Sequence, residues 1–426
     1  MHLRRAIGIA VMLTVVTAVV LPAYAQDNGR GWWPFGRKSS SWPAEDPFKR
    51  SVNNLQPIGP AIQLAPGYPT LSTANLQPIR DAIQRYQAIV AQGGWPEMPA
   101  YELRPGRRHA AVPLLRERLI IAGDLTQNGG RQRSYDSNVE AAVKRFQERH
   151  GLKPSGIVDV ATLQAFNVAP SVRVRQLQAN LAQLEKLAKA AANKYVVVNI
   201  PAAQVEAVEN GRVVSRHVAV VGKLDRQTPT LKSKVHEINF NPYWTVPRSI
   251  VRKDLVPKAR DYQRQGLDVL ESYRMDAYDA RGRRLNPKEI DWNSDAVYKY
   301  TYKQVPWEDN SLGFVKINFH NKHAVYMHDT PLKNLFGSDF RAESSGCVRV
   351  ADVDQLVAWM LRDTPGWDLG RVQQMKQTGQ QLDVKLKSRI PVYFVYLTAW
   401  ATPDGQAHFR HDMYRRHGVG VTASAY

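Results

Sequence analysis

Apolar residues recur at helical spacing in two stretches of the chain. In residues 74–92 they recur every three or four positions, and Gly93-Gly94-Trp95-Pro96 then ends the pattern. Residues 171–193 carry a second such stripe of four leucines. This spacing predicts two amphipathic helices. We assign them to a helical scaffold over residues 71–97 and 170–193.

Residues 98–169, between these helices, show three further helical signals. Apolar positions over 112–120 predict a first helix, and Ser137-Asn138-Val139-Glu140 matches a capping box at the start of a second. Asp159 begins a short third one. The pattern resembles the three-helix peptidoglycan-binding domain of many wall enzymes. A helical spacer without a ligand is the alternative.

From residue 194 the pattern changes to alternating or continuous apolar runs, which predict β-strands. The runs cover residues 195–200, 204–208, 213–221, 235–240, 314–319, 324–328 and 392–397. Asn210-Gly211 is a hairpin turn signal between two of them. We therefore predict an α+β multidomain protein with a mostly β domain over residues 194–400 and one or two helices, one near Val353–Leu361.

Two segments depart from this β pattern. Residues 248–312 begin with a basic stretch and end in Tyr298-Lys299-Tyr300-Thr301-Tyr302. An insertion of this kind beside an active site is a candidate lid, and a passive surface excursion is the alternative. Residues 401–426 are polar, and we expect a C-terminal tail in which His408 and His411 are solvated.

The N-terminus has the features of an export signal. Arg4 and Arg5 precede the uncharged run 6–21, and Ala23-Tyr24-Ala25 is a small-x-small cleavage site. We expect cleavage after residue 25, with an uncleaved anchor as the alternative, and a flexible linker over residues 26–70. The expected location is the periplasm of a Gram-negative-type envelope, in association with the cell wall.

The charge of the chain narrows the partner class. The 426 residues carry a formal net charge of +20, and loss of residues 1–25 leaves +18. This excess of positive charge indicates an anionic partner. The alternative is that it only keeps the protein soluble. Export argues against nucleic acid and favours cell-envelope material.

The motifs that the chain lacks exclude several kinds of chemistry. With one cysteine, the chain has no intramolecular disulfide. It has no phosphate-binding loop and no dinucleotide fingerprint, so no cofactor is expected. His320, His323 and His328 would not converge on a metal, because strand faces alternate.

The sole cysteine lies in Ser344-Ser345-Gly346-Cys347-Val348-Arg349, and His328 closes an earlier strand. A thiolate is the nucleophilic form of cysteine, so a neighbouring base or positive field is required. His328 is the candidate base across neighbouring strands. The backbone amides of Ser345, Gly346 and Cys347 are candidate oxyanion donors, and Arg349 either holds a substrate carboxylate or shapes the loop.

These residues resemble the signature of the L,D-transpeptidases, in which a histidine precedes a Ser-His-Gly-Cys motif by about fifteen residues. The resemblance extends to Val221-Gly222, Thr228-Pro229, residues 241–250 and residues 321–331. The larger, lidded members of that family match best. Ser345 stands where many relatives have a second histidine, which leaves the role of that position open.

The resemblance implies a mechanism. Cys347 would attack the third-residue carbonyl of a peptidoglycan tetrapeptide stem, with His328 as base or as partner in a thiolate–imidazolium pair. D-alanine would leave, and the diamino-acid amine of a neighbouring stem would then form a 3→3 cross-link. Backbone groups around Asp329 would orient the imidazole. Carbapenems are the expected inhibitors.

Two aromatic residues and several other activities remain open. Tyr326 and Trp244 either line the substrate groove or belong to the core. The same thioester would also serve an L,D-carboxypeptidase or an enzyme that anchors proteins to the wall. A non-catalytic wall-binding protein is the remaining alternative.

Overall fold

The computed structural model describes residues 67–126, 132–338 and 340–417. The expected export signal and nearly all of the expected linker lie outside these residues. No helix within the described part of the chain has the length and apolar character needed to span a membrane.

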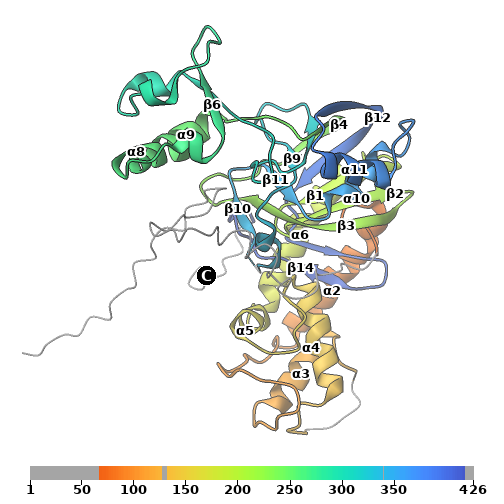
Figure 1. Ribbon diagram of the computed structural model, residues 1–426. Helices are drawn as coiled ribbons and strands as arrows, with labels where there is room; N and C mark the ends of the chain where they lie inside the picture. The colour runs from red at the N-terminus through yellow and green to blue at the C-terminus, as the bar shows by residue number, and fades with distance from the viewer. Residues whose placement is uncertain (1–66, 127–131, 339, 418–426) are drawn as a thin grey trace, which may run out of the picture. The chain divides into compact units, whose positions relative to one another are not determined.

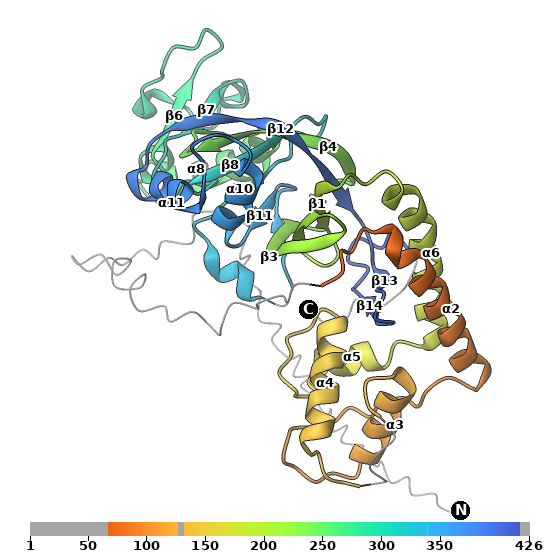
Figure 2. The same cartoon turned by 90° about the vertical axis from the view of Figure 1, so that its right-hand side faces the viewer.

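Two long helices form the scaffold, and Figure 2 shows them side by side. They are α2 (Leu76–Ala91), which follows the short 3-10 turn η1 (Thr73–Asn75), and α6 (Pro170–Ala188). Both therefore lie where the helical spacing predicts them. Ile79 and Tyr86 of α2 pack with Leu177 of α6 in one buried cluster.

The unit between them contains the three expected helices. They are α3 (Val112–Ala122), α4 (Ser137–Arg149) and α5 (Val160–Phe166). The capping box prediction is wrong by one residue. Asp136 is the N-cap of α4 and accepts from the amides of Asn138 and Val139. The negative charge of this carboxylate also interacts favourably with the positive N-terminal end of the helix dipole.

A mixed sheet forms the β domain. Its strands are β1 (Lys194–Asn199), β2 (Gln204–Glu209), β3 (Arg212–Gly222), β4 (Leu231–Phe240), β8 (Val315–Phe319), β9 (Met327–His328), β10 (Ala342–Ser344), β11 (Val348–Val350) and β12 (Leu382–Val395). Among the described residues their order is β10-β3-β11-β9-β8-β4-β12-β1-β2, and β2 also pairs with β3, so the sheet closes on itself. Asn210 and Gly211 both have positive φ at the β2–β3 turn, as a primed hairpin turn requires.

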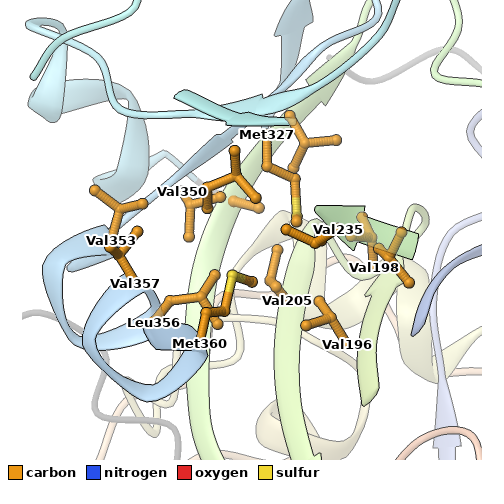
Figure 3. Close-up of a cluster of buried hydrophobic side chains, with 14 of the residues drawn as sticks. Val196, Val198, Val205, Val235, Met327, Val350, Val353, Leu356, Val357 and Met360 are labelled. Atoms are coloured by element: carbon orange, nitrogen blue, oxygen red, sulfur yellow. The ribbon is translucent and has the colours of Figure 1, made fainter. Parts of the chain in front are cut away.

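The main core lies between this sheet and α10 (Val353–Leu361), with α11 (Leu369–Thr378) beside it (Figures 1 and 3). Met327 and Val350 point from neighbouring strands toward Leu356 and Met360 of α10 (Figure 3). Because side chains alternate along a strand, the neighbours of Met327 and Val350 lie on the other face of the sheet. The α+β architecture is as predicted.

Residues 244–304 interrupt the sheet with a small separate one. Its order is β5-β7-β6, from β5 (Trp244–Thr245), β7 (Thr301–Gln304) and β6 (Met275–Tyr278). The helical turns of this segment are α7 (Arg248–Ile250), the π-helix η2 (Val251–Leu255), α8 (Val256–Arg264), α9 (Val269–Ser272), η3 (Pro287–Glu289) and η4 (Asp295–Tyr298). A further 3-10 turn, η5 (Lys333–Gly337), follows β9.

The C-terminal segment differs from the expected tail. Residues 401–417 include most of the hairpin of β13 (Ala399–Ala401) and β14 (Ala407–Phe409), and Phe409 packs into the scaffold cluster. His408 stacks on Trp400 instead of being solvated. The sequence did not predict this packing, because a hairpin of this length has only two or three apolar positions per strand.

Candidate active site

Three neighbouring strands place the candidate residues on the face of the sheet opposite α10. In the ladder, Arg349 of β11 pairs with His328 of β9, and Lys316 of β8 pairs with His328 from the other side. One step earlier along β11, Cys347 follows the same register and lies across from Tyr326. Residues two apart on a strand share a face. Cys347 and Arg349 therefore share a face with Tyr326 and His328.

Tyr326 links the cysteine to the rest of the site. Its hydroxyl and its backbone hydrogen-bond to the Cys347 thiol. The Nε1–H of Trp244 donates to the same hydroxyl over 3.2 Å. The ring of Tyr326 lies 5.5 Å from that of His328, edge to face. Tyr326 therefore neighbours both the sulfur and the imidazole.

The site is buried, and burial dominates its titration. Desolvation raises the pKa of the Cys347 thiol, although hydrogen bonds from Tyr326 and the charges of Lys316 and Arg349 oppose this rise. Desolvation, together with the positive charge of Arg349, lowers the pKa of His328 to about 3. A backbone hydrogen bond to Asp329 acts in the opposite direction on His328.

These two shifts define the resting protonation state. At neutral pH the imidazole is uncharged and the sulfur carries its proton. Both the thiol and the imidazole are therefore neutral at rest. This differs from the thiolate–imidazolium pair considered above, because burial and the positive charges of Arg349 and Lys316 all disfavour a charged imidazole. A neutral imidazole is the form that accepts a proton.

The reactivity of the thiol toward iodoacetamide should follow from this state. Since only the thiolate alkylates, we expect the rate to rise about tenfold per pH unit between pH 6 and 8, without a plateau. Loss of the single thiol, monitored by mass, measures this rate. A plateau with its midpoint below pH 7 would instead reveal a thiolate at rest.

The hydroxyl of Ser344 stabilises the turn at Cys347. Ser344 Oγ donates to the Cys347 carbonyl over 2.5 Å and accepts from the Gly346 amide over 3.1 Å. Gly346 has φ +112°, a conformation that side chains rarely adopt. Because its amide is already engaged, the amides of Ser345 and Cys347 are the better candidates for oxyanion donors.

A cavity of about 270 Å³ opens beside this turn. Ser345 and Gly346 line it from one side, and Ser249 and Lys253 line it from the inserted segment. At its edge Arg226 donates to Ser345 Oγ over 2.9 Å. The same guanidinium binds both carboxylate oxygens of Asp254, at 2.5 and 3.1 Å. Arg226 therefore joins the turn to the π-helix η2.

Two family models match the chain. Residues 193–372 match the L,D-transpeptidase catalytic domain. The chain contains an L,D-transpeptidase catalytic domain. Residues 108–166 match the family described as "putative peptidoglycan binding domain". Both resemblances drawn from the sequence are thereby confirmed at the level of these two domains.

The chain is also similar to a curated relative and to solved structures. The chain is 32% identical over 206 residues to a curated "Putative L,D-transpeptidase" of Haemophilus influenzae, a match that covers 48% of this chain and 41% of the relative. The chain thus matches less than half the length of that relative. Among solved structures, L,D-transpeptidases of Xylanimonas cellulosilytica and Stackebrandtia nassauensis match at 16% and 15% identity. The matches cover 70% of this chain and 100% and 96% of theirs, with TM-scores of 0.24 and 0.28.

Within the L,D-transpeptidase domain, three residues predicted to bind substrate are enclosed. Arg349 is 1% exposed, and its positive charge lowers the pKa of the Cys347 thiol against the larger effect of burial. Trp244 is buried and donates a hydrogen bond to the Tyr326 hydroxyl. The Asp329 carboxylate accepts from the Phe314 amide and pairs with Lys333, which braces the end of β9.

Sequence reasoning missed other residues that surround this candidate site. Lys316 was missed because a lysine on the outer face of a strand is common, and the ladder alone reveals that it neighbours His328. Lys316 and Tyr243 also line a second, polar cavity of about 780 Å³. Arg226 and Asp254 are 28 residues apart, and no spacing rule joins them.

Proposed function

We propose that the protein is a cysteine-dependent L,D-transpeptidase that forms 3→3 cross-links in peptidoglycan. The observation that carries the proposal is the position of Cys347 and His328 on one face of β9 and β11, inside a matched L,D-transpeptidase catalytic domain. A tetrapeptide stem is the proposed donor. The amine of a diamino acid in a second stem is the proposed acceptor.

In the first step His328 would take the proton of Cys347 as the sulfur attacks the carbonyl of the third stem residue. Proton transfer and attack would be coupled, because neither the thiolate nor the imidazolium is stable in the resting site. The amides of Ser345 and Cys347 would receive the developing oxyanion. Return of the proton to the leaving amine releases D-alanine and leaves a thioester on Cys347.

In the second step the acceptor amine would attack the thioester, with His328 taking a proton from the amine and returning it to sulfur. Water is the competing nucleophile, and hydrolysis would make the enzyme an L,D-carboxypeptidase. Exclusion of water from the closed site favours transfer. We propose residues 248–312 as the lid that provides this exclusion.

Arg226 is the proposed latch of the lid. It bridges Asp254, in the π-helix of the inserted segment, and Ser345, in the nucleophile turn. Both members of the ion pair are largely buried, with exposed side-chain fractions of 17% and 13%, so the pair is better shielded from water than a surface bridge. Ser345 would therefore accept the hydrogen bond that ties the nucleophile turn to the lid. This role does not require the histidine that many relatives carry at the same position.

Substitution of the latch carboxylate should alter the fate of the thioester. In Asp254→Asn we expect the ratio of hydrolysis to transfer to rise about fivefold, the effect of a contact worth about 1 kcal/mol. Asp225→Asn is the matched control, since Asp225 also lies beside Arg226 but is 66% exposed and outside the proposed lid. Chromatography of tripeptide and dimer products gives the ratio. An equal ratio in wild type and Asp254→Asn would contradict the latch.

Mass spectrometry of products tests the function itself. Purified protein incubated with disaccharide-tetrapeptide should yield 3→3 dimers and free D-alanine. Tripeptide without dimer would identify an L,D-carboxypeptidase. Transfer of the stem to an added protein would identify an anchoring ligase. Unchanged substrate would support a non-catalytic wall-binding protein.

The remaining assignments complete this proposal. Residues 98–169 would hold the enzyme on peptidoglycan, and residues 71–97 and 170–193 would connect this unit to the catalytic domain. Export by residues 1–25 would bring the protein to the periplasm, where its substrate is found. Carbapenems would acylate Cys347 as analogues of the donor.

A further inference from the structure

The chain returns to the active site after the C-terminal hairpin. The hydroxyl of Tyr414 donates to the Gly222 carbonyl over 2.5 Å and accepts from the Thr228 amide over 3.2 Å. Tyr414 is 7% exposed, and burial raises the pKa of its phenol. The hydroxyl therefore keeps the proton that it donates.

Thr228 continues this contact to the nucleophile turn. Its hydroxyl donates to the Gly346 carbonyl over 2.9 Å and accepts from the Gly222 amide over 2.8 Å. The loop between Gly222 and Thr228 is tight, since a Cβ atom on Gly222 would lie 2.6 Å from the Thr228 nitrogen. The chain of hydrogen bonds thus runs from Tyr414 to the residue immediately before Cys347.

Tyr414 is itself fixed in place. Its ring stacks on that of Tyr396 at 5.5 Å. Its amide donates to the Tyr396 hydroxyl over 2.7 Å, and that hydroxyl donates to Asp412 over 2.7 Å. Earlier in the same segment, Arg410 donates to the Arg149 carbonyl at the end of α4. The phenol is therefore presented to the loop by a segment anchored in the catalytic domain and on the helical unit.

We propose that Tyr414 is a positioning residue of the active site, which holds the Gly346–Cys347 turn in its reactive orientation through Thr228. Without the phenol hydroxyl, the Gly222 carbonyl and the Thr228 amide lose a buried partner, and the turn gains freedom. An oxyanion donor must be oriented before the reaction to be effective. Looser orientation should therefore slow acylation more than it weakens binding. The kinetic part of this inference rests on the proposed function.

The test compares full-length wild type with Tyr414→Phe. We expect hydrogen–deuterium exchange in peptides covering residues 342–350 to accelerate about tenfold, the effect of one lost buried hydrogen bond. With a tetrapeptide donor, we expect kcat to fall about tenfold and KM to change less than twofold. Thr228→Val should give the same two changes, and the double variant should add little to either.

Tyr195→Phe is the matched control. Tyr195 is equally buried, and its hydroxyl donates to the Leu71 carbonyl on the scaffold side. This variant should lower the Tm and leave the exchange of residues 342–350 and kcat unchanged. If Tyr414→Phe behaves like Tyr195→Phe, the proposal is overturned. If wild type releases no D-alanine, the proposed function fails, while the exchange of the turn still decides the role of Tyr414.

Discussion

Replacing Cys347 with alanine is expected to abolish acyl transfer. The described site offers no second thiol, and the chain contains no other cysteine. Removal of a nucleophile that acts together with its base costs about 10⁴-fold or more in kcat. Release of D-alanine from a tetrapeptide donor, followed by chromatography, measures the loss. Stability should change little, because the substitution removes only one heavy atom from a half-buried side chain.

Cys347→Ser is the companion variant. It retains a hydroxyl of similar size in the same turn, so it preserves the cavity and the bond geometry around the nucleophile. A serine hydroxyl is far less acidic than a thiol, and we expect a loss close to that of alanine. D-alanine release by the alanine variant at a tenth of the wild-type rate would show that another group performs the attack.

Replacing His328 with glutamine is expected to slow acylation by about 10³-fold, within the range that a general base contributes. Glutamine retains hydrogen-bonding groups in a side chain that is 5% exposed, which limits the structural damage. Without a base, attack depends on the thiolate fraction alone. Because burial raises the pKa of Cys347, the residual rate should rise about tenfold per pH unit through pH 8.

The acylation rate of the wild type should depend less steeply on pH than that of His328→Gln. The pKa of His328, about 3, keeps the imidazole neutral through the acidic range, so the base stays available down to about pH 4. His320→Gln, an exposed imidazole that stacks on His236, is the control and should retain the wild-type rate and profile. A His328→Gln rate within threefold of wild type would remove His328 from the mechanism.

The sequence predicted the elements whose residues alternate or repeat over several positions. The scaffold helices, the hairpin at Asn210-Gly211 and most central strands were found this way, because each buries one regular face. The pairing of Cys347 and His328 as candidates also came from the sequence, through the spacing between His328 and the Ser-Gly-Cys turn. These features depend on local order alone.

The environment of the site could not be predicted in this way. The pKa of His328 depends on Arg349 and Lys316, which become neighbours only through the register of β8, β9 and β11. The burial of Arg349 likewise follows from the packing of the sheet and from no local pattern. The C-terminal hairpin was missed because its strands have three residues each. Its stability comes from packing against the scaffold, and local propensity contributes little.

Intact-mass spectrometry after mixing the protein with a tetrapeptide donor tests the central claim most directly. The account predicts a transient adduct equal in mass to the donor acyl group without D-alanine, which peptide mapping places on Cys347. Hydroxylamine should remove it, as expected of a thioester. If D-alanine is released while the Cys347 thiol stays free for iodoacetamide throughout, the account is contradicted.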